Sequence, residues 1–168
     1  MALVQYVAIN AKLYGLTLQK QSFMQIAIFG ATGMVGKQLV QQSLFKGHHV
    51  KAFGRNVFTA GFNEHENLHL LQGALFDEQQ VCDAVTGSDA ILSALGGGVD
   101  GSDKSRSLGM KNIVAQMTKA GVRRIVAIGG MGILDDTAGK LIMDSKEFPP
   151  QYLPVSREHL AAFHFLEK

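Results

Sequence analysis

Residues 25–36 read QIAIFGATGMVG, an apolar run followed at once by glycines at positions 30, 33 and 36. The run Gln25–Phe29 predicts a buried strand, and apolar residues at helical spacing predict a helix over 34–46 that ends before Gly47. The spacing GxxGxxG between a strand and a helix is typical of a turn that binds the pyrophosphate of a dinucleotide. The first glycine permits the tight turn, the second lets phosphate approach the backbone, and the third lets the helix pack on the strand.

Outside this stretch, short apolar runs alternate with segments of helical periodicity. The further strands expected are 50–53, 68–71, 90–95 and 124–128, and the further helices are 78–85, 105–120 and 156–168, the last with Ser156 as its N-cap. Strands that alternate with helices indicate parallel pairing through right-handed crossovers. The sequence therefore predicts a Rossmann-like α/β domain over residues 24–168. Its doubly wound parallel sheet has about five strands in the order 3-2-1-4-5, within three αβα layers.

The glycines gather at one edge of this expected sheet. Twelve of the nineteen lie in the segments just after the five expected strands. They are Gly30, Gly33, Gly36, Gly54, Gly73, Gly96, Gly97, Gly98, Gly101, Gly129, Gly130 and Gly132. Open α/β sheets bind ligands at the carboxyl ends of their strands, and small residues there let a ligand approach the backbone. Ordinary turn glycines are the alternative, but those are expected at both ends of strands.

The residues after the second expected strand bear on the choice of dinucleotide. A site for NAD usually has Asp or Glu about 20 residues after the glycine loop, where it binds the ribose 2′-hydroxyl. Here the sequence is Phe53-Gly54-Arg55-Asn56, and the next acid is Glu64. Arg55 can pair with a 2′-phosphate, so the sequence favours NADP(H). A solvated surface arginine is the alternative.

Composition argues against several other classes of protein. With 46% apolar and 18% charged residues, the chain as a whole is not expected to be disordered. One cysteine excludes a disulfide scaffold and, with no export signal in the sequence, favours the cytoplasm. A net charge of +2, with no basic run longer than Arg123-Arg124, indicates no nucleic-acid partner. No stretch is both long and apolar enough to predict a membrane span.

Residues 1–23 precede the first expected strand and show no motif of their own. We expect either an extension that is not part of the domain or a short arm attached to it. No function is assigned to this segment.

Patterns that carry catalytic chemistry are sparse. The segment His65-Glu66-Asn67-Leu68-His69 matches HExxH, but that zinc site needs both histidines on one face of a helix. The strand expected over 68–71 leaves no room for such a helix, so no metal site is predicted. None of the three tyrosines has a lysine four residues later, so a Tyr-x-x-x-Lys proton-transfer pair is absent. His159 remains as the catalytic candidate, with a structural histidine as the alternative.

Three segments carry a family resemblance. IAIFGATGMVG at 26–36, Arg55, and GMKNIVAQMTKAGVRRIVAI at 109–128 resemble the atypical short-chain dehydrogenases with an NAD(P)-binding Rossmann fold. The most similar group is that of the NADPH-dependent flavin reductases and biliverdin reductase B, among the NmrA-like NAD(P)H-binding proteins. Like that group, the chain has valine and histidine, at Val155 and His159, where classical members have tyrosine and lysine.

The resemblance implies a role for each matching residue. Gly30, Thr32, Gly33, Met34 and Val35 would hold the pyrophosphate, Arg55 the 2′-phosphate, and Leu75 the adenine. Ala94, Leu95 and Gly96 would line the ribose and phosphate side, Ile128, Gly129 and Gly130 would lie beside the nicotinamide ribose, and His159 would border the nicotinamide.

The chain also departs from this family pattern. It has Gly73-Ala74 where relatives often carry Asp, and Gly129-Gly130 where they carry Ser or Thr. Family members continue beyond the last expected helix with a sixth strand and much of the substrate pocket, so we expect the chain to lack that part. The fifth strand would then be an edge, through which self-association is expected.

These features predict NADPH-dependent reduction of a flavin or similar conjugated acceptor by direct hydride transfer. Met131, Ile133 and Leu134 would form part of an apolar pocket for the acceptor. Water can deliver the proton, so the missing tyrosine and lysine need not prevent this reaction. Two alternatives stay open: a non-catalytic NADP(H)-binding or redox-sensing module, and an inactive truncated relative.

Overall fold

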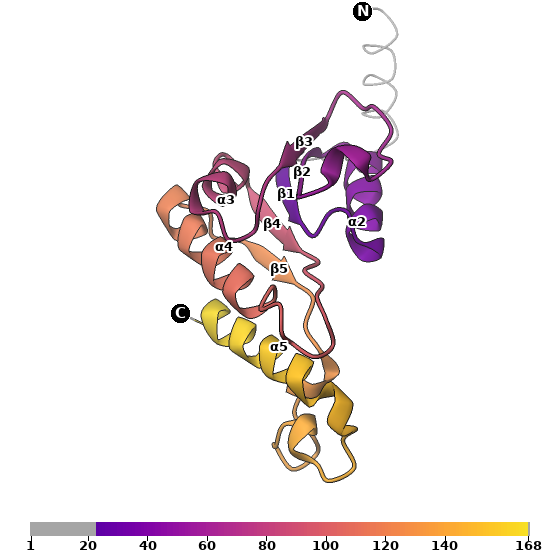
Figure 1. Cartoon of the computed structure of the whole chain (residues 1–168). Coiled ribbons are helices and arrows are strands. Elements are labelled where there is room, and N and C mark those ends of the chain that lie inside the picture. Colours follow the sequence, from indigo (N-terminus) through magenta and orange to yellow (C-terminus); the bar gives the residue numbers. More distant parts are fainter. Residues whose placement is uncertain (1–22, 168) are drawn as a thin grey trace, which may run out of the picture.

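A parallel sheet of five strands forms the centre of the computed structural model, which describes residues 23–167 (Figure 1). The strands are β1 (Gln25–Phe29), β2 (His49–Gly54), β3 (Leu68–Gln72), β4 (Ala90–Ser93) and β5 (Ile125–Ala127). Their order is β3-β2-β1-β4-β5, and every neighbouring pair is parallel. The predicted Rossmann-like fold and strand order are confirmed. The predicted N-terminal extension, apart from Phe23, lies outside the described residues.

Four helices accompany the sheet. They are α2 (Met34–Phe45), α3 (Glu78–Val85), α4 (Ser107–Ala120) and α5 (Leu153–Leu166). Figure 1 shows α2 on one side of the sheet, α3 and α4 on the other, and α5 alongside α4. None of these helices, within the described residues, is long and apolar enough to cross a membrane.

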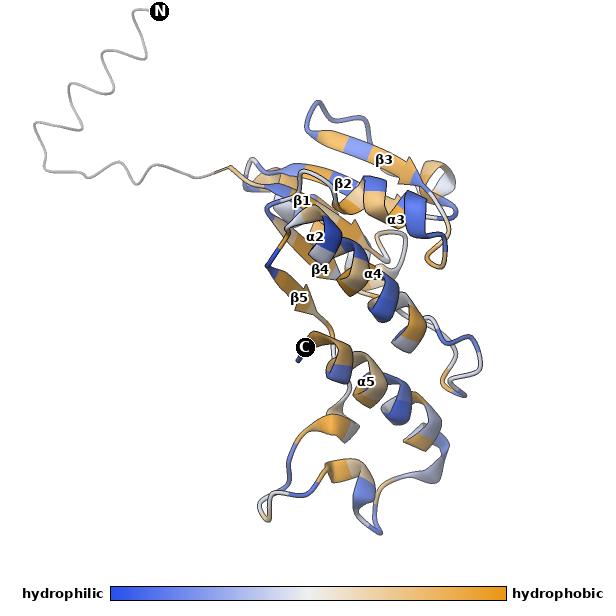
Figure 2. Ribbon diagram, turned by 90° about the vertical axis from the view of Figure 1, so that its left-hand side faces the viewer, coloured by the Kyte–Doolittle hydropathy of each residue, from blue (hydrophilic) through white to orange (hydrophobic). Residues whose placement is uncertain are grey.

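Side chains that alternate along the strands fill one core on each face of the sheet. On β1, Ala27 and Phe29 join the core beneath α3 and α4, whereas Ile26 and Ile28 join the core beneath α2. All four are buried because helices cover both faces of the sheet, as is usual for parallel sheets. The strands are accordingly largely orange in Figure 2, whereas α4 and α5 alternate between orange and blue.

Most predicted boundaries agree with the structure to within two residues. The strand expected over 90–95 ends early, at Ser93, and the helix expected over 105–120 begins late, at Ser107. Both differences fall at the ends of the glycine-rich loop between β4 and α4. Side chains fix that loop by hydrogen bonds to its backbone, in place of strand pairing or helical bonds.

The predicted start of the last helix was wrong. Ser156 was expected as its N-cap, but α5 begins at Leu153, and Ser156 lies inside the helix with 4% of its surface exposed. The 3-10 turn Pro150–Tyr152 leads straight into α5, and Pro154 fits the first helical turn, where its missing N–H loses no hydrogen bond. The hydroxyl of Ser156 instead packs against Gly132.

We propose that two copies of the chain associate through β5. Within residues 23–167 this strand has no neighbour on its outer side, and Val126 and Ile128 are 57% and 49% exposed. Unpaired edge groups invite pairing with a second chain. Light scattering should show an average mass that rises with concentration, and Val126→Lys should reduce this rise because a charge at the edge opposes pairing. A mass equal to one chain at every concentration would contradict the proposal.

Candidate functional site

A cavity of about 660 Å³ opens at the carboxyl ends of the strands. Open α/β sheets bind their ligands at this edge. All five strand ends contribute to its wall, which has one cationic residue and no acidic one. The lining residues are Gly30, Thr32, Gly33, Met34, Val35, Phe53, Gly54, Arg55, Gly73, Ala74, Leu75, Phe76, Ala94, Leu95, Gly96, Ser105 and Ile128.

The turn between β1 and α2 requires glycine at two positions. Gly30 has a φ of +76°, and a Cβ on it would collide with the carbonyl oxygen of Ala94. A Cβ on Gly36 would collide with the carbonyl oxygen of Gly30. These close backbone approaches bring β1, β4 and the first turn of α2 together beside the cavity.

The N-terminus of α2 faces the cavity and is not capped by a side chain. Its N-cap is Gly33, no side chain caps the helix, and its first turn has no acidic residue. Gly33, Met34 and Val35 all line the cavity. The free N–H groups of this turn, together with the positive end of the helix dipole, therefore suit an anion such as a pyrophosphate.

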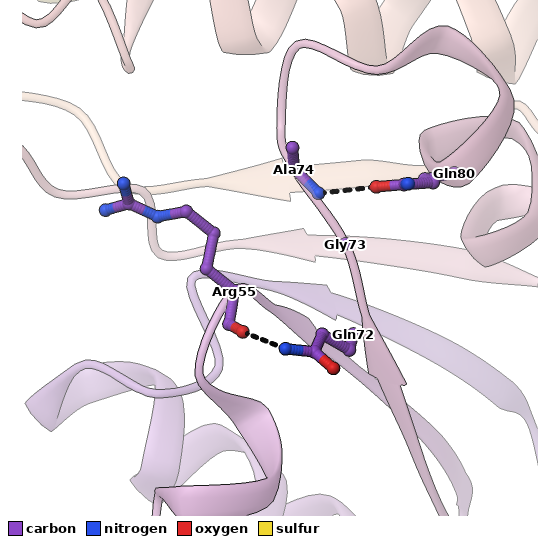
Figure 3. Close-up of a pocket in the computed structure, with 5 residues that line it drawn as sticks. All are labelled: Arg55, Gln72, Gly73, Ala74 and Gln80. Carbon is purple, nitrogen blue, oxygen red and sulfur yellow. Dashed lines mark hydrogen bonds between the residues drawn. The ribbon is translucent and has the colours of Figure 1, made fainter.

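Arg55 stands where the cavity meets a polar side pocket of about 400 Å³ (Figure 3). Gln72 Nε2 donates to the carbonyl oxygen of Arg55 at 2.9 Å, which holds the backbone there. The arginine side chain extends away from Gln72 in Figure 3, and no hydrogen bond or ion pair within residues 23–167 engages its guanidinium. An unpaired guanidinium suits a phosphate group.

The loop after β3 is held by side chains from two helices. The N–H of Ala74 donates to Oε1 of Gln80 at 2.7 Å, as Figure 3 shows, so this backbone is fixed although no aspartate follows Gly73. Asn112 Nδ2 on α4 donates to the carbonyl oxygen of Leu75 at 3.0 Å. Helices α3 and α4 thereby position Ala74 and Leu75 at the cavity wall.

Two charged side chains fix the glycine-rich loop after β4. The carboxylate of Asp103 accepts the N–H groups of Gly98 and Ser105 at 2.8 and 3.0 Å. The backbone hydrogen bonds from Ser105 and Gly98 hold the pKa of Asp103 below its usual value. Arg106 donates to the carbonyl oxygens of Gly97 and Gly98 at 3.1 and 3.2 Å. Ser105, which lines the cavity, is therefore held in place by its own loop.

His159 is half-buried beside the end of β5. A Cβ built on Gly130 would lie 2.7 Å from Cδ2 of His159, so the imidazole fills the space that a side chain at position 130 would need. Burial lowers the pKa of His159, the charge of Arg106 lowers it further, and the charge of Glu158 opposes both. The ring is therefore uncharged near neutral pH.

The structure brings most of the predicted cofactor residues around one cavity. Those that line it are Gly30, Thr32, Gly33, Met34, Val35, Arg55, Leu75, Ala94, Leu95, Gly96 and Ile128. Gly129, Gly130 and His159 lie at the β5 end and are not part of this lining. Phe53, Gly54, Gly73, Ala74, Phe76 and Ser105 also line the cavity. The glycine bias indicated Gly54 and Gly73, whereas the place of Ser105 depends on the fold of its loop.

The HExxH segment does not form a metal site. His69 lies in β3 and His65 in the loop before it, where His65 Nδ1 accepts the N–H of Asn67 at 3.1 Å. Among the described residues, no group of three or more His, Cys, Asp or Glu side chains could hold a metal ion. The predicted strand occupies this position as β3, whereas HExxH chemistry depends on a helix.

Comparison with known proteins agrees with this geometry. Residues 30–168 match the NAD(P)H-binding family. The chain belongs to that family. The predicted cofactor class, NAD(P)H, is thereby confirmed.

Three similar proteins place the chain among longer relatives. It is 27% identical over 135 residues to the uncharacterised protein YwnB of Bacillus subtilis, covering 79% of this chain and 61% of that protein. A proposed exported protein from Burkholderia pseudomallei has 32% identity and a TM-score of 0.70, covering 85% of this chain and 66% of that one. A proposed NADH-flavin reductase from Streptococcus pneumoniae has 25% identity and a TM-score of 0.67, with coverages of 85% and 65%. The chain thus spans less than two thirds of each relative.

We predict that His159 titrates below the usual histidine range. The unfolded chain protonates His159 more readily than the folded chain does. The contribution of His159 to the free energy of unfolding is therefore present above the usual histidine pKa and is lost as the pH falls through the lowered pKa of the folded protein. NMR titration of the ring tests the direction. Gly130→Ala should push the ring outward and raise its pKa toward the ordinary value. Gly129→Ala is the matched control, since its methyl group has ordinary room. An unchanged titration in Gly130→Ala would contradict the contact.

Proposed function

We propose that the protein uses NADPH to reduce a flavin or similar conjugated acceptor by direct hydride transfer. The observation that carries this proposal is a single cavity that joins the glycine turn and the free N-terminus of α2 to the unpaired Arg55. Similarity to the Streptococcus protein, itself a proposed NADH-flavin reductase, supports the choice of acceptor. We also propose a cytoplasmic location, because the chain has one cysteine and so no disulfide of its own.

The residues around the cavity match the parts of NADPH in turn. The N–H groups at the start of α2 would bind the pyrophosphate, for which Gly30 and Gly33 leave room. The guanidinium of Arg55 would pair with the 2′-phosphate, and the lining offers no acid to bind a free 2′-hydroxyl in its place. Leu75 would flank the adenine, and Gly96 would leave room for the nicotinamide ribose.

At the β5 end the chain offers apolar surface. When bound, NADPH supplies a hydride to the acceptor. Ile128 lines the cavity and is 49% exposed, and Met131 and Leu134 beyond it are 65% and 58% exposed. These side chains would hold a flat conjugated ring against the cavity and keep water from its face. An uncharged His159 would border the acceptor as a hydrogen-bonding group, while solvent supplies the proton.

The second candidate function is NADP(H) binding without catalysis, as in a redox-sensing module or an inactive relative. One observation favours it: His159 is not among the cavity's lining residues. Both functions use the same nucleotide-binding residues. They differ in whether an acceptor is reduced.

We predict that the purified protein oxidises NADPH faster than the uncatalysed rate when FMN or riboflavin is in excess. Arg55→Ala should raise the KM for NADPH about 10- to 100-fold, because a hydrogen bond to a charged group contributes about 1.5–3 kcal/mol. The KM for NADH should change little, since NADH has no 2′-phosphate. Initial rates from NADPH absorbance measure both.

The matched control is Arg157→Ala, which removes an exposed arginine of α5 that is not part of the lining. It should leave both KM values unchanged. Equal losses for NADPH and NADH in Arg55→Ala would show that the 2′-phosphate is bound elsewhere. Tight NADPH binding without turnover would favour the binding module, and a folded protein that binds no nucleotide would contradict both functions.

A further inference from the structure

Glu158 on α5 is a buried carboxylate with three donors, and the proposed reaction does not use it directly. Its surface is 6% exposed. Ser107 donates its hydroxyl to Oε2 at 2.5 Å and its N–H at 3.3 Å, and Lys104 Nζ donates to Oε1 at 2.9 Å. Burial raises the pKa of Glu158, but the hydrogen bonds from Ser107 and Lys104 outweigh it and hold the pKa below the usual value. The carboxylate is therefore ionised at neutral pH.

Through these contacts Glu158, a residue of α5, caps the N-terminus of α4. Helix α4 has no side-chain cap of its own and no acid in its first turn. Glu158 accepts the N–H of Ser107, the first residue of α4, where the helix dipole favours a negative charge. Lys104, its ion-pair partner, has a φ of +53° and is the one non-glycine residue in 23–167 with a positive φ. Such a backbone persists where surrounding contacts determine it.

The cap also determines where His159 stands, because His159 follows Glu158 directly in α5. Three glycines let this helix approach neighbouring backbone closely. A Cβ on Gly130 would lie 2.7 Å from the His159 ring, one on Gly101 would lie 3.0 Å from Cγ of Glu158, and one on Gly132 would collide with another side chain of α5. A shift of α5 would disturb these three contacts and the cap together.

We propose that Glu158 is a positioning residue: by capping α4, it holds the imidazole of His159 against Gly130 at the acceptor side of the site. The expected effect of Glu158 on kcat rests on the proposed function, whereas its effect on the position of His159 can be measured without turnover. The capped end of α4 begins two residues after Ser105, which lines the cavity.

A second glutamate–lysine pair, which joins α3 to α4, provides the control. Lys119, near the other end of α4, pairs with Glu78 at 3.1 Å, and their side chains are 59% and 73% exposed. Exposed pairs of this kind contribute little to stability. Glu78→Ala thus removes a glutamate–lysine pair between α3 and α4 without touching the junction of α4 with α5.

The experiment compares Glu158→Ala, Ser107→Ala and the control Glu78→Ala in the full chain. The first readout is the nuclear Overhauser cross-peak between the His159 ring and the Gly130 α protons. Glu158→Ala should abolish it, Ser107→Ala should weaken it, and Glu78→Ala should leave it unchanged. With FMN and NADPH, Glu158→Ala should lower kcat on the order of 10- to 100-fold and leave the Kd for NADPH unchanged. A role in stability alone would lower the melting temperature without moving the cross-peak of the folded protein.

Three outcomes decide the proposal. A cross-peak of wild-type intensity in folded Glu158→Ala overturns it, and Ser107→Ala decides in the same way if Glu158→Ala does not fold. A lost cross-peak with unchanged kcat also overturns it, because the position of His159 would then have no consequence for the reaction. A lost cross-peak in a protein whose wild type reduces no flavin supports the positioning role and instead removes the proposed function.

Discussion

The close backbone contact between Gly30 and Gly36 is the constraint on which the rest of the site depends. A side chain on either glycine would meet a carbonyl oxygen, that of Ala94 or that of Gly30. Only glycine therefore lets α2 begin directly at the end of β1 and next to β4. Because β1 is the central strand, this turn lies in the middle of the row of strand ends. The free N–H groups of α2 consequently open onto the cavity that those strand ends surround.

The two sides of the site are held by different forces. On the nucleotide side, the paired strands fix the loops, and the neutral amides of Gln72 and Gln80 hold the backbone of Arg55 and Ala74. On the proposed acceptor side, β4 pairs with β5, and charged groups additionally hold the loop after β4 and helix α5. A sheet keeps its geometry across a wide range of pH, whereas a buried carboxylate such as Glu158 holds its donors only while ionised. The acceptor side is therefore the more sensitive to acid.

The distribution of charge around the cavity suits hydride transfer better than proton transfer. Arg55 is the one cation of the lining, and the lining has no acid. At the β5 end, Met131 and Leu134 present apolar surface, and His159 is uncharged near neutral pH. A conjugated acceptor can take a hydride in such surroundings because water completes the reaction. A substrate hydroxyl would need a base that these residues do not supply.

The five strands and the glycine turn can be predicted from the sequence, because apolar periodicity and glycine spacing are local signals. The handedness of the crossovers then gives the order of the strands. Local signals also placed Arg55 at the cavity, since it directly follows a strand. They misplaced the start of α5, where proline chemistry prevailed over the capping signal of Ser156. The cap that Glu158 provides to Ser107, 51 residues away, and the place of His159 above Gly130 emerge from the packing of the folded chain. Contacts between segments so far apart leave no periodicity or spacing in the sequence, because they depend on how the packed elements meet.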